Sequence, residues 1–222
     1  MVHEMKTLAL DVYGTLINPH ALSTRLSNYL GEQADAFSQT WRTKQLEFSF
    51  RRGLMRKYAD FSVVTRDALE YADVSFGSTL SANAKTVLLD EYSRLEAYAG
   101  VPEELARMRM QGRSLYAFSN GVPGQLESLM KHAGIADLLD GIISVHDVRS
   151  FKPDPKVYEH FNHSTNTLAK DTTLVSSNAF DICGAQACGW NTAWLKRDSN
   201  TIFDTWGDGP DLVIESLNEL LG

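Results

Sequence analysis

The chain has 222 residues, of which 43% are hydrophobic and 22% are charged, as is ordinary for a globular protein with a substantial core. Its formal net charge of −7 argues against nucleic acid or an anionic membrane as a partner, because both reward a basic surface. The first ten residues lack the apolar core and cleavage site of a signal peptide, and no apolar run approaches the ~20 residues of a membrane span. These properties predict a cytoplasmic protein.

The first predicted strand covers residues 7–11 and ends in an acid, Asp11. In the segment that follows, Gly14 permits a sharp turn and Thr15 can hydrogen-bond a carboxylate or a backbone group. An aspartate at the end of a strand can form an Asx turn, or it can act as a carboxylate nucleophile. This segment alone leaves both interpretations open.

Residues 17–98 are predicted to form a run of helices. Apolar and aromatic side chains recur at a spacing near 3.6 through 35–55 and again through 84–98. We interpret Trp41, Phe48 and Phe50 as packing residues of these helices. Arg42 lies near Lys44 and Glu47 in the sequence, so taken alone it is interpreted as a solvated surface residue.

The rest of the chain alternates strands with helices. Strands are predicted at 114–120, 172–178 and 192–197, and helices at 123–134 and 180–189, each helix ending at a glycine. This order predicts an α/β fold with a doubly wound parallel sheet. We expect a core domain of residues 1–16 and 99–222 and an inserted helical cap domain of residues 17–98. Ligands of such sheets bind at the carboxyl ends of the strands.

Polar residues stand at the end of the second predicted strand. Ser119 and Asn120, followed by Gly121, are typical of a turn or a helix start, and they could equally supply a hydroxyl, an amide and backbone donors to an anion. Lys152 precedes a proline that keeps it extended. A lone lysine is usually solvated, but one fixed beside Asp11 would keep that aspartate ionised.

A second acid follows the strand predicted at 172–178. Asp181 lies in the first turn of the next helix, where it could compensate the helix dipole or orient a water molecule. Cys183 and Cys188 are five residues apart in the same helix, so their side chains diverge. We interpret both cysteines as packing residues that form neither a disulfide nor a metal pair.

Four segments in this order and at these separations resemble the haloacid dehalogenase superfamily, and the L-2-haloacid dehalogenases in particular. They are DVYGT (11–15), SNG (119–121), KP (152–153) and SSNAFD (176–181). WRTKQLEF (41–48) and LMRKYADF (54–61) also resemble the cap of those enzymes, so the similarity extends over nearly the whole chain.

Two positions distinguish the dehalogenases from the phosphatases of this superfamily. The phosphatases carry a second aspartate two residues after the nucleophile and a magnesium-binding aspartate four residues before the last acid; here Tyr13 and Ser177 stand there. Loss of the leaving-group acid and of one hard oxygen ligand disfavours magnesium-assisted phosphoryl transfer. A halide leaves without protonation, so these residues favour carbon–halogen cleavage without a metal or another cofactor.

The resemblance implies hydrolysis of (S)-2-haloalkanoic acids to (R)-2-hydroxyalkanoic acids. Asp11 would displace the halide from C2 and form an ester, which water then hydrolyses. Thr15 and Lys152 would position Asp11, while Asp181, supported by Ser176 and Asn178, would activate the water. The implied catalytic residues are Asp11, Thr15, Arg42, Ser119, Lys152, Tyr158, Ser176, Asn178 and Asp181.

The resemblance also implies a binding site for the substrate. Ser119 and the backbone amides after Asp11 would hold its carboxylate, and Arg42 and Asn120 would receive the halide. The implied substrate contacts are Val12, Tyr13, Arg42, Leu46, Phe61, Ser119, Asn120 and Phe180. Thr43 and Phe180 replace a glutamine and a tryptophan that are frequent in the family, which leaves the preferred chain length of the acid open.

Dimerisation is common in this family, so we expect a homodimer whose substrate is a small 2-haloacid. Two alternatives remain at this point. The first is a magnesium-dependent phosphatase that has diverged at Tyr13 and Ser177. The second is a catalytically idle relative that binds an organic anion or another protein.

Overall fold

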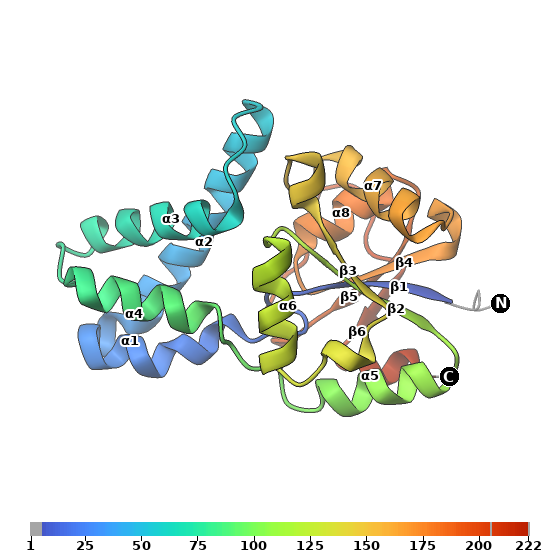
Figure 1. Ribbon diagram of the computed structural model, residues 1–222, viewed down its shortest axis with the longest axis horizontal. Helices are drawn as coiled ribbons and strands as arrows, with labels where there is room; N and C mark the ends of the chain where they lie inside the picture. Colours follow the sequence, from blue (N-terminus) through green and yellow to red (C-terminus); the bar gives the residue numbers. More distant parts are fainter. Residues whose placement is uncertain (1–5, 205, 222) are drawn as a thin grey trace.

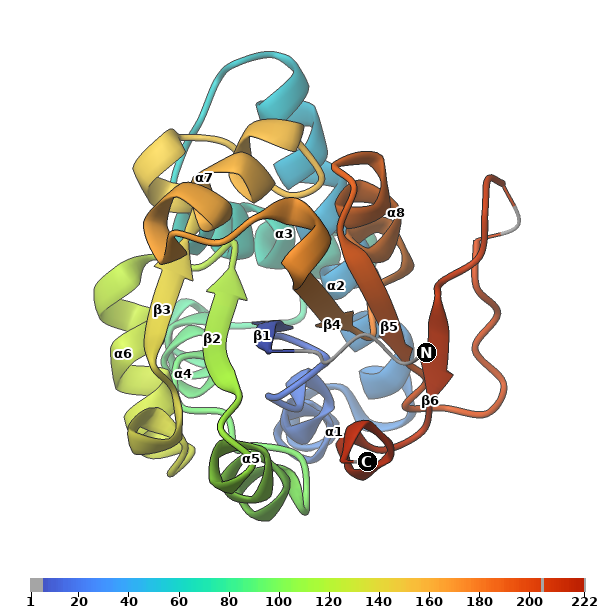
Figure 2. The same ribbon diagram turned by 90° about the vertical axis from the view of Figure 1, so that its right-hand side faces the viewer.

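The computed structural model describes residues 6–204 and 206–221 and has a six-stranded parallel sheet at its centre. The strand order is β3-β2-β1-β4-β5-β6 (Figures 1 and 2). β1 is buried at every position, as expected of a central strand covered on both faces. The strands are β1 (Thr7–Asp11), β2 (Ser114–Ser119), β3 (Gly141–Ser144), β4 (Thr172–Ser176), β5 (Asn191–Leu195) and β6 (Leu212–Ile214).

Helices cover both faces of this sheet. In both views α5 lies on one side of the strands and α7 and α8 lie on the other (Figures 1 and 2). Right-handed crossovers account for this arrangement, because the chain builds β2 and β3 on one side of β1 and then crosses to build β4 and β5 on the other. These helices are α5 (Val101–Met110), α6 (Pro123–His132), α7 (Pro155–Thr165) and α8 (Ala179–Ala187).

Four further helices lie between β1 and α5 in the sequence and to the left of the sheet in Figure 1. The two connections between this helical segment and the rest of the chain lie side by side. Ile17 forms an isolated β-bridge with Ala97, and the Tyr98 amide donates to the Leu16 carbonyl. Asp60 caps α3 by accepting from the Val63 amide. The helices are α1 (Ser23–Leu30), α2 (Ala34–Leu54), α3 (Phe61–Ser75) and α4 (Ala82–Tyr92).

The predicted fold class is confirmed, and the predicted strands at 7–11, 114–120, 172–178 and 192–197 correspond to β1, β2, β4 and β5. β3 and β6 were not predicted. β4 ends at Ser176, two residues earlier than predicted, because Ser177 and Asn178 turn the chain into α8. Both cysteines are free thiols, in agreement with the sequence. Within the two described ranges, no helix is both long enough and apolar enough to cross a membrane.

The position of β1 decides where a ligand can bind. β1 lies between β2 and β4, which is the point where the direction of strand addition reverses. In doubly wound sheets this reversal opens a crevice at the carboxyl ends of the strands. Asp11 is the last residue of β1 and therefore lies at that crevice.

Candidate active site

Asp11 is nearly buried and ends β1 just before a tight turn. The turn is closed by the Gly14 amide, which donates to the Ile17 carbonyl, and Gly14 has a φ of +89° that favours glycine. Thr15 follows Gly14 in this turn, and its hydroxyl donates to Asp11 Oδ2 at 2.9 Å. The Thr15 oxygen in turn accepts from the Ser177 amide at 2.9 Å, which fixes the direction of the Thr15 hydroxyl.

The two oxygens of Asp11 have different surroundings. Oδ2 accepts from Thr15, from Ser176 Oγ at 3.1 Å and from Asn178 Nδ2 at 2.7 Å. Oδ1 faces the ammonium of Lys152 at 3.2 Å. Three hydrogen bonds therefore orient the carboxylate through Oδ2, while Oδ1 keeps a lone pair for a reacting atom.

Lys152 lies between the two acids of the site. Its ammonium contacts Asp11 Oδ1 at 3.2 Å, Asp181 Oδ2 at 2.7 Å and the Phe118 carbonyl at 2.8 Å, which uses all three of its donors. The same nitrogen lies 4.0 Å from the centre of the Phe118 ring. The Lys152 amide donates to Asn120 Oδ1 at 2.9 Å, so the loop that carries the lysine is held to the end of β2.

Asp181 is fully buried in the first turn of α8. Burial raises its pKa from 3.8 to about 6, although the neighbouring Lys152 pulls the pKa in the opposite direction. Tyr158 donates to Asp181 Oδ1 at 2.8 Å and favours the charged form as well. A carboxylate with a pKa near 6 can accept a proton from water close to neutral pH.

Arg42 reaches the site from α2. Its Nη2 lies 3.5 Å from the Tyr13 carbonyl and 3.4 Å from Asn178 Oδ1, and its Nη1 donates to Gln45 Oε1 at 2.7 Å. Asn178 Nδ2 also donates to the Tyr13 carbonyl at 3.1 Å. The guanidinium of Arg42, from the helical segment, therefore lies beside Asn178, which donates to Asp11.

Ser119 is the last residue of β2 and Asn120 follows it. Both lie next to Asp11, because Asp11 pairs with Phe118 in the register of β1 and β2. Ser119 is buried and its oxygen accepts from the Gly121 amide at 3.1 Å. Asn120 uses its carbonyl oxygen for Lys152, which leaves its amide hydrogens available to a ligand.

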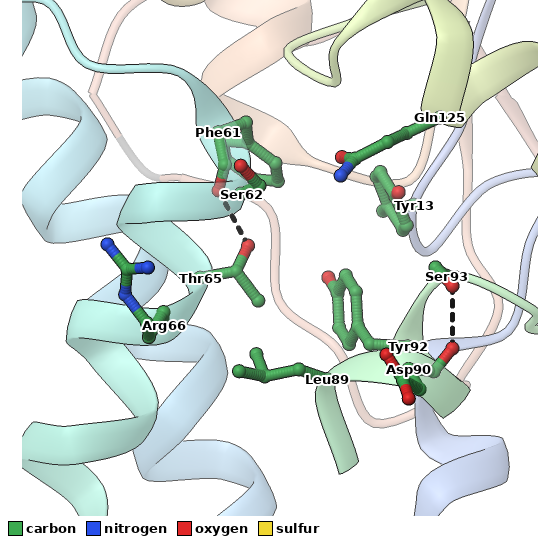
Figure 3. Close-up of a pocket in the computed structure, with 10 residues that line it drawn as sticks. All are labelled: Tyr13, Phe61, Ser62, Thr65, Arg66, Leu89, Asp90, Tyr92, Ser93 and Gln125. Atoms are coloured by element: carbon green, nitrogen blue, oxygen red, sulfur yellow. Dashed lines mark hydrogen bonds between the residues drawn. The ribbon is translucent and has the colours of Figure 1, made fainter. Parts of the chain in front are cut away.

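A cavity of about 250 Å³ opens beside Tyr13, between the helical segment and α6 (Figure 3). Tyr13 and Phe61 line it, with ring centres 6.1 Å apart, and Tyr92 stacks on Tyr13 at 5.2 Å. Burial raises the pKa of Tyr13 far above its usual range, so the phenol stays neutral.

The other predicted substrate contacts lie elsewhere around the site. Val12 is buried in the turn after β1, Leu46 is half-buried on α2, and Phe180 packs against Phe50 of α2 at 5.0 Å. Phe50 therefore contacts α8 in addition to packing in its own helix.

Three polar residues near Arg42 were not predicted from the sequence. They are Gln45 of α2, Thr65 of α3 and Tyr92 of α4, and both Thr65 and Tyr92 are hydrogen-bonded to Gln45. Gln45 stands three residues after Arg42, a spacing that places both on one face of a helix. That spacing was the available signal for Gln45, whereas Thr65 and Tyr92 carry no local signal.

The donor set of this site suits an ammonium better than a metal. The two carboxylates both contact Lys152, and the side chain of Ser177 is a hydroxyl whose buried oxygen has no hydrogen-bond partner. Among the described residues, no three His, Cys, Asp or Glu side chains are grouped so that they could hold a metal ion.

Comparison with known proteins agrees with this geometry. The haloacid dehalogenase-like hydrolase family matches residues 5–189. The (S)-2-haloacid dehalogenase of Pseudomonas sp. strain YL is 35% identical over 98% of this chain and 93% of its own. The (S)-2-haloacid dehalogenase 4A of Burkholderia cepacia is 33% identical over 90% of this chain and 87% of its own.

Solved structures give the same result. The L-2-haloacid dehalogenase of Xanthobacter autotrophicus with chloropropionic acid covalently bound has a TM-score of 0.90 at 30% identity, covering 97% of this chain and 96% of its own. The L-2-haloacid dehalogenase RSc1362 has a TM-score of 0.93 at 30% identity with the same coverage. The chain therefore belongs to the haloacid dehalogenase-like hydrolases, in the branch of the L-2-haloacid dehalogenases.

Proposed function

We propose that the chain hydrolyses (S)-2-haloalkanoic acids to (R)-2-hydroxyalkanoic acids and halide through an ester on Asp11. The arrangement of Asp11, Lys152 and Asp181 is the observation that supports this proposal most strongly. Asp11 is held by three donors on Oδ2 and keeps a lone pair on Oδ1 beside the Lys152 ammonium, and Asp181 has a pKa of about 6. A single lysine contacts both acids.

The first step is a displacement at carbon. Asp11 Oδ1 attacks C2 from the side opposite the halogen, the C–O bond forms, and the halide leaves with the electron pair of the broken bond. Thr15, Ser176 and Asn178 keep the carboxylate aligned for this attack. Arg42 and the Asn120 amide stabilise the charge that develops on the halogen. Ser119 and the backbone after Asp11, including Val12, hold the substrate carboxylate.

The second step hydrolyses the ester. Water attacks the carbonyl carbon of Asp11 and gives a proton to Asp181, which Lys152 and Tyr158 hold in place. The bond between this carbonyl carbon and the substrate oxygen then breaks, and the departing alkoxide takes the proton from Asp181 to become the hydroxyl of the product. The remaining proton passes to solvent, so both Asp11 and Asp181 return as carboxylates. C2 is attacked only once, so its configuration inverts. No step requires a metal ion, which fits the neutral side chains of Tyr13 and Ser177.

The helices of residues 17–98 act as a cap over the carboxyl ends of the strands, and the predicted core domain is residues 1–16 and 99–222, of which residues 1–5, 205 and 222 lie outside the described part of the chain. Tyr13, Leu46, Phe61 and Phe180 form the apolar wall around the alkyl chain.

The location and the oligomeric state of the chain complete the proposal. We place the chain in the cytoplasm, as the sequence predicts. Exposed apolar side chains on α2 and α3, including Leu54 at 86% and Val74 at 68% exposure, fit the contact of a homodimer.

A direct assay separates the proposal from its alternatives. Purified protein in excess chelator should release chloride from (S)-2-chloropropionate and form (R)-lactate, and Asp11→Asn should abolish both products. Magnesium-dependent release of phosphate from p-nitrophenyl phosphate, without chloride release, would identify a phosphatase. Absence of both activities would leave a binding protein and refute the proposal.

A further inference from the structure

Gln45 is an uncharged side chain buried beside the guanidinium of Arg42. It is 1% exposed and lies one helical turn after Arg42 on α2. Its Oε1 accepts from Arg42 Nη1 at 2.7 Å and from Tyr92 Oη at 3.2 Å. Its Nε2 donates to Thr65 Oγ1 at 2.7 Å. Three helices, α2, α3 and α4, therefore meet at this one amide.

The orientation of this amide is fixed by the direction of its hydrogen bonds. The Thr65 hydroxyl has one hydrogen, which it donates to the Phe61 carbonyl at 2.8 Å (Figure 3). Its oxygen can therefore only accept from Gln45, and the NH₂ group of the amide must face Thr65. The carbonyl oxygen of Gln45 consequently faces Arg42. A flipped amide would place two donors against the guanidinium.

The hydrogen bond from Arg42 to the Gln45 amide is shorter than the contacts of Arg42 with residues of the sheet domain. Arg42 Nη1 lies 2.7 Å from Gln45, whereas Nη2 lies 3.4 Å from Asn178 and 3.5 Å from the Tyr13 carbonyl. The ion pairs among the described residues do not include Arg42. An amide orients a guanidinium without neutralising it, whereas a carboxylate at the same place would compete with an incoming anion.

We propose that Gln45 is a positioning residue that aims Arg42 at the departing halide, with Thr65 fixing the direction of the amide. The proposal rests on the function proposed above, in which Arg42 stabilises the leaving group. Under this proposal, Gln45 determines how fast the enzyme releases a poor leaving group such as chloride. Chloride is bound to carbon more strongly than bromide, so its departure depends more on a correctly placed guanidinium.

Four substitutions test the two contacts of the proposal, that of Gln45 with Arg42 and that of Thr65 with Gln45. Gln45→Met keeps the approximate volume and removes every hydrogen bond, while Gln45→Glu keeps the shape and adds a negative charge. Thr65→Val removes the hydroxyl that fixes the amide, and Thr65→Ser retains it. Gln39→Met is the matched control, because Gln39 is an exposed glutamine on the same helix.

The rate of halide release in a single turnover is the first readout. Gln45→Met should slow release from (S)-2-chloropropionate by about 10- to 100-fold, and release from (S)-2-bromopropionate by a smaller factor. Thr65→Val should show the same preference with a smaller loss, whereas Thr65→Ser and Gln39→Met should match the unmodified protein. Equal losses for both halides would contradict the proposal, because a general loss of structure slows both.

A double-mutant cycle with Arg42→Lys separates positioning from packing. If Gln45 acts through Arg42, Gln45→Met should change the chloride rate less than twofold in the Arg42→Lys protein. The same 10- to 100-fold loss in both backgrounds would show that Gln45 acts on its own and would overturn the proposal.

Halide binding without turnover tests the proposal independently of catalysis. Bromide at constant ionic strength should raise the thermal midpoint of the unmodified protein and of Gln39→Met. It should have little effect on Gln45→Glu or Arg42→Lys. Equal bromide stabilisation of Gln45→Glu and the unmodified protein would refute the role of Gln45. If bromide binds as expected but no substrate is turned over, the proposed dehalogenase function fails and the positioning of Arg42 stands.

Discussion

Asp181→Asn should stabilise the protein while it abolishes turnover. Asp181 is fully buried and its pKa is raised from 3.8 to about 6, chiefly by burial. A difference of one in pKa corresponds to about 1.4 kcal/mol, so keeping this group ionised in the folded state costs about 3 kcal/mol above pH 6. Asparagine has the same shape and carries no charge, so the variant avoids this cost.

The effect must depend on pH in a defined direction. Below pH 3.8 the carboxyl is protonated in both the folded and the unfolded states, so it contributes no cost. Between pH 3.8 and about 6 the unfolded chain is ionised while the folded protein retains the proton, so stability falls as the pH rises. Above pH 6 the cost is constant. The advantage of Asp181→Asn should therefore grow from pH 4 to pH 6 and then level off.

Urea unfolding at a series of pH values measures this difference, and thermal unfolding at pH 8 should show a gain of about 10 °C for a chain of this size. Asp208→Asn, at an exposed aspartate, is the control and should show no such trend. Repeating the comparison in an Asp11→Asn background removes the interaction between the two acids. A difference that stays constant from pH 4 to 8, or a variant less stable than the unmodified protein at pH 8, would show that the ionised Asp181 does not destabilise the folded protein.

Two further predictions concern the surroundings of Asp181. Tyr158→Phe removes the hydroxyl that donates to Asp181 at 2.8 Å and should raise the pKa of Asp181 further, because that hydrogen bond favours the charged form. The acid limb of the kcat profile should then move to higher pH; an unmoved limb would argue that Asp181 is not the base. Gly184→Ala would bring a Cβ into Tyr158 Oη and to 2.6 Å from Pro153 Cβ, and should lower the free energy of unfolding by about 1–3 kcal/mol. Gly124→Ala, with open space around it, should cost nothing in the same denaturation experiment.

Much of the site follows from the order of its residues along the chain. Asp11, Ser119 and Ser176 each end a strand, and the carboxyl ends of parallel strands share one edge of the sheet. Lys152 follows β3, a strand of four residues that is too short for its periodicity to show. The fold class could therefore be predicted, although β3 and β6 were missed.

The residues around Arg42 could not be predicted in the same way. Thr65 and Tyr92 reach Gln45 from two other helices, and this contact depends on how α3 and α4 pack on α2. Packing of helices depends on complementary side-chain shape over whole surfaces, which a local pattern does not encode. The raised pKa of Asp181 likewise depends on burial that arises only when α7 and α8 cover the sheet.

The ester on Asp11 distinguishes this mechanism from attack of water on C2, and a single turnover in H₂¹⁸O detects it. Excess enzyme is mixed with (S)-2-chloropropionate, and mass spectrometry locates the label in the lactate and in the peptide that contains Asp11. We expect the label in the Asp11 carboxylate and unlabelled lactate in the first turnover, because water attacks the carbonyl carbon of the ester. Labelled lactate with an unlabelled Asp11 peptide would mean that water attacks C2 directly and that no ester forms on Asp11.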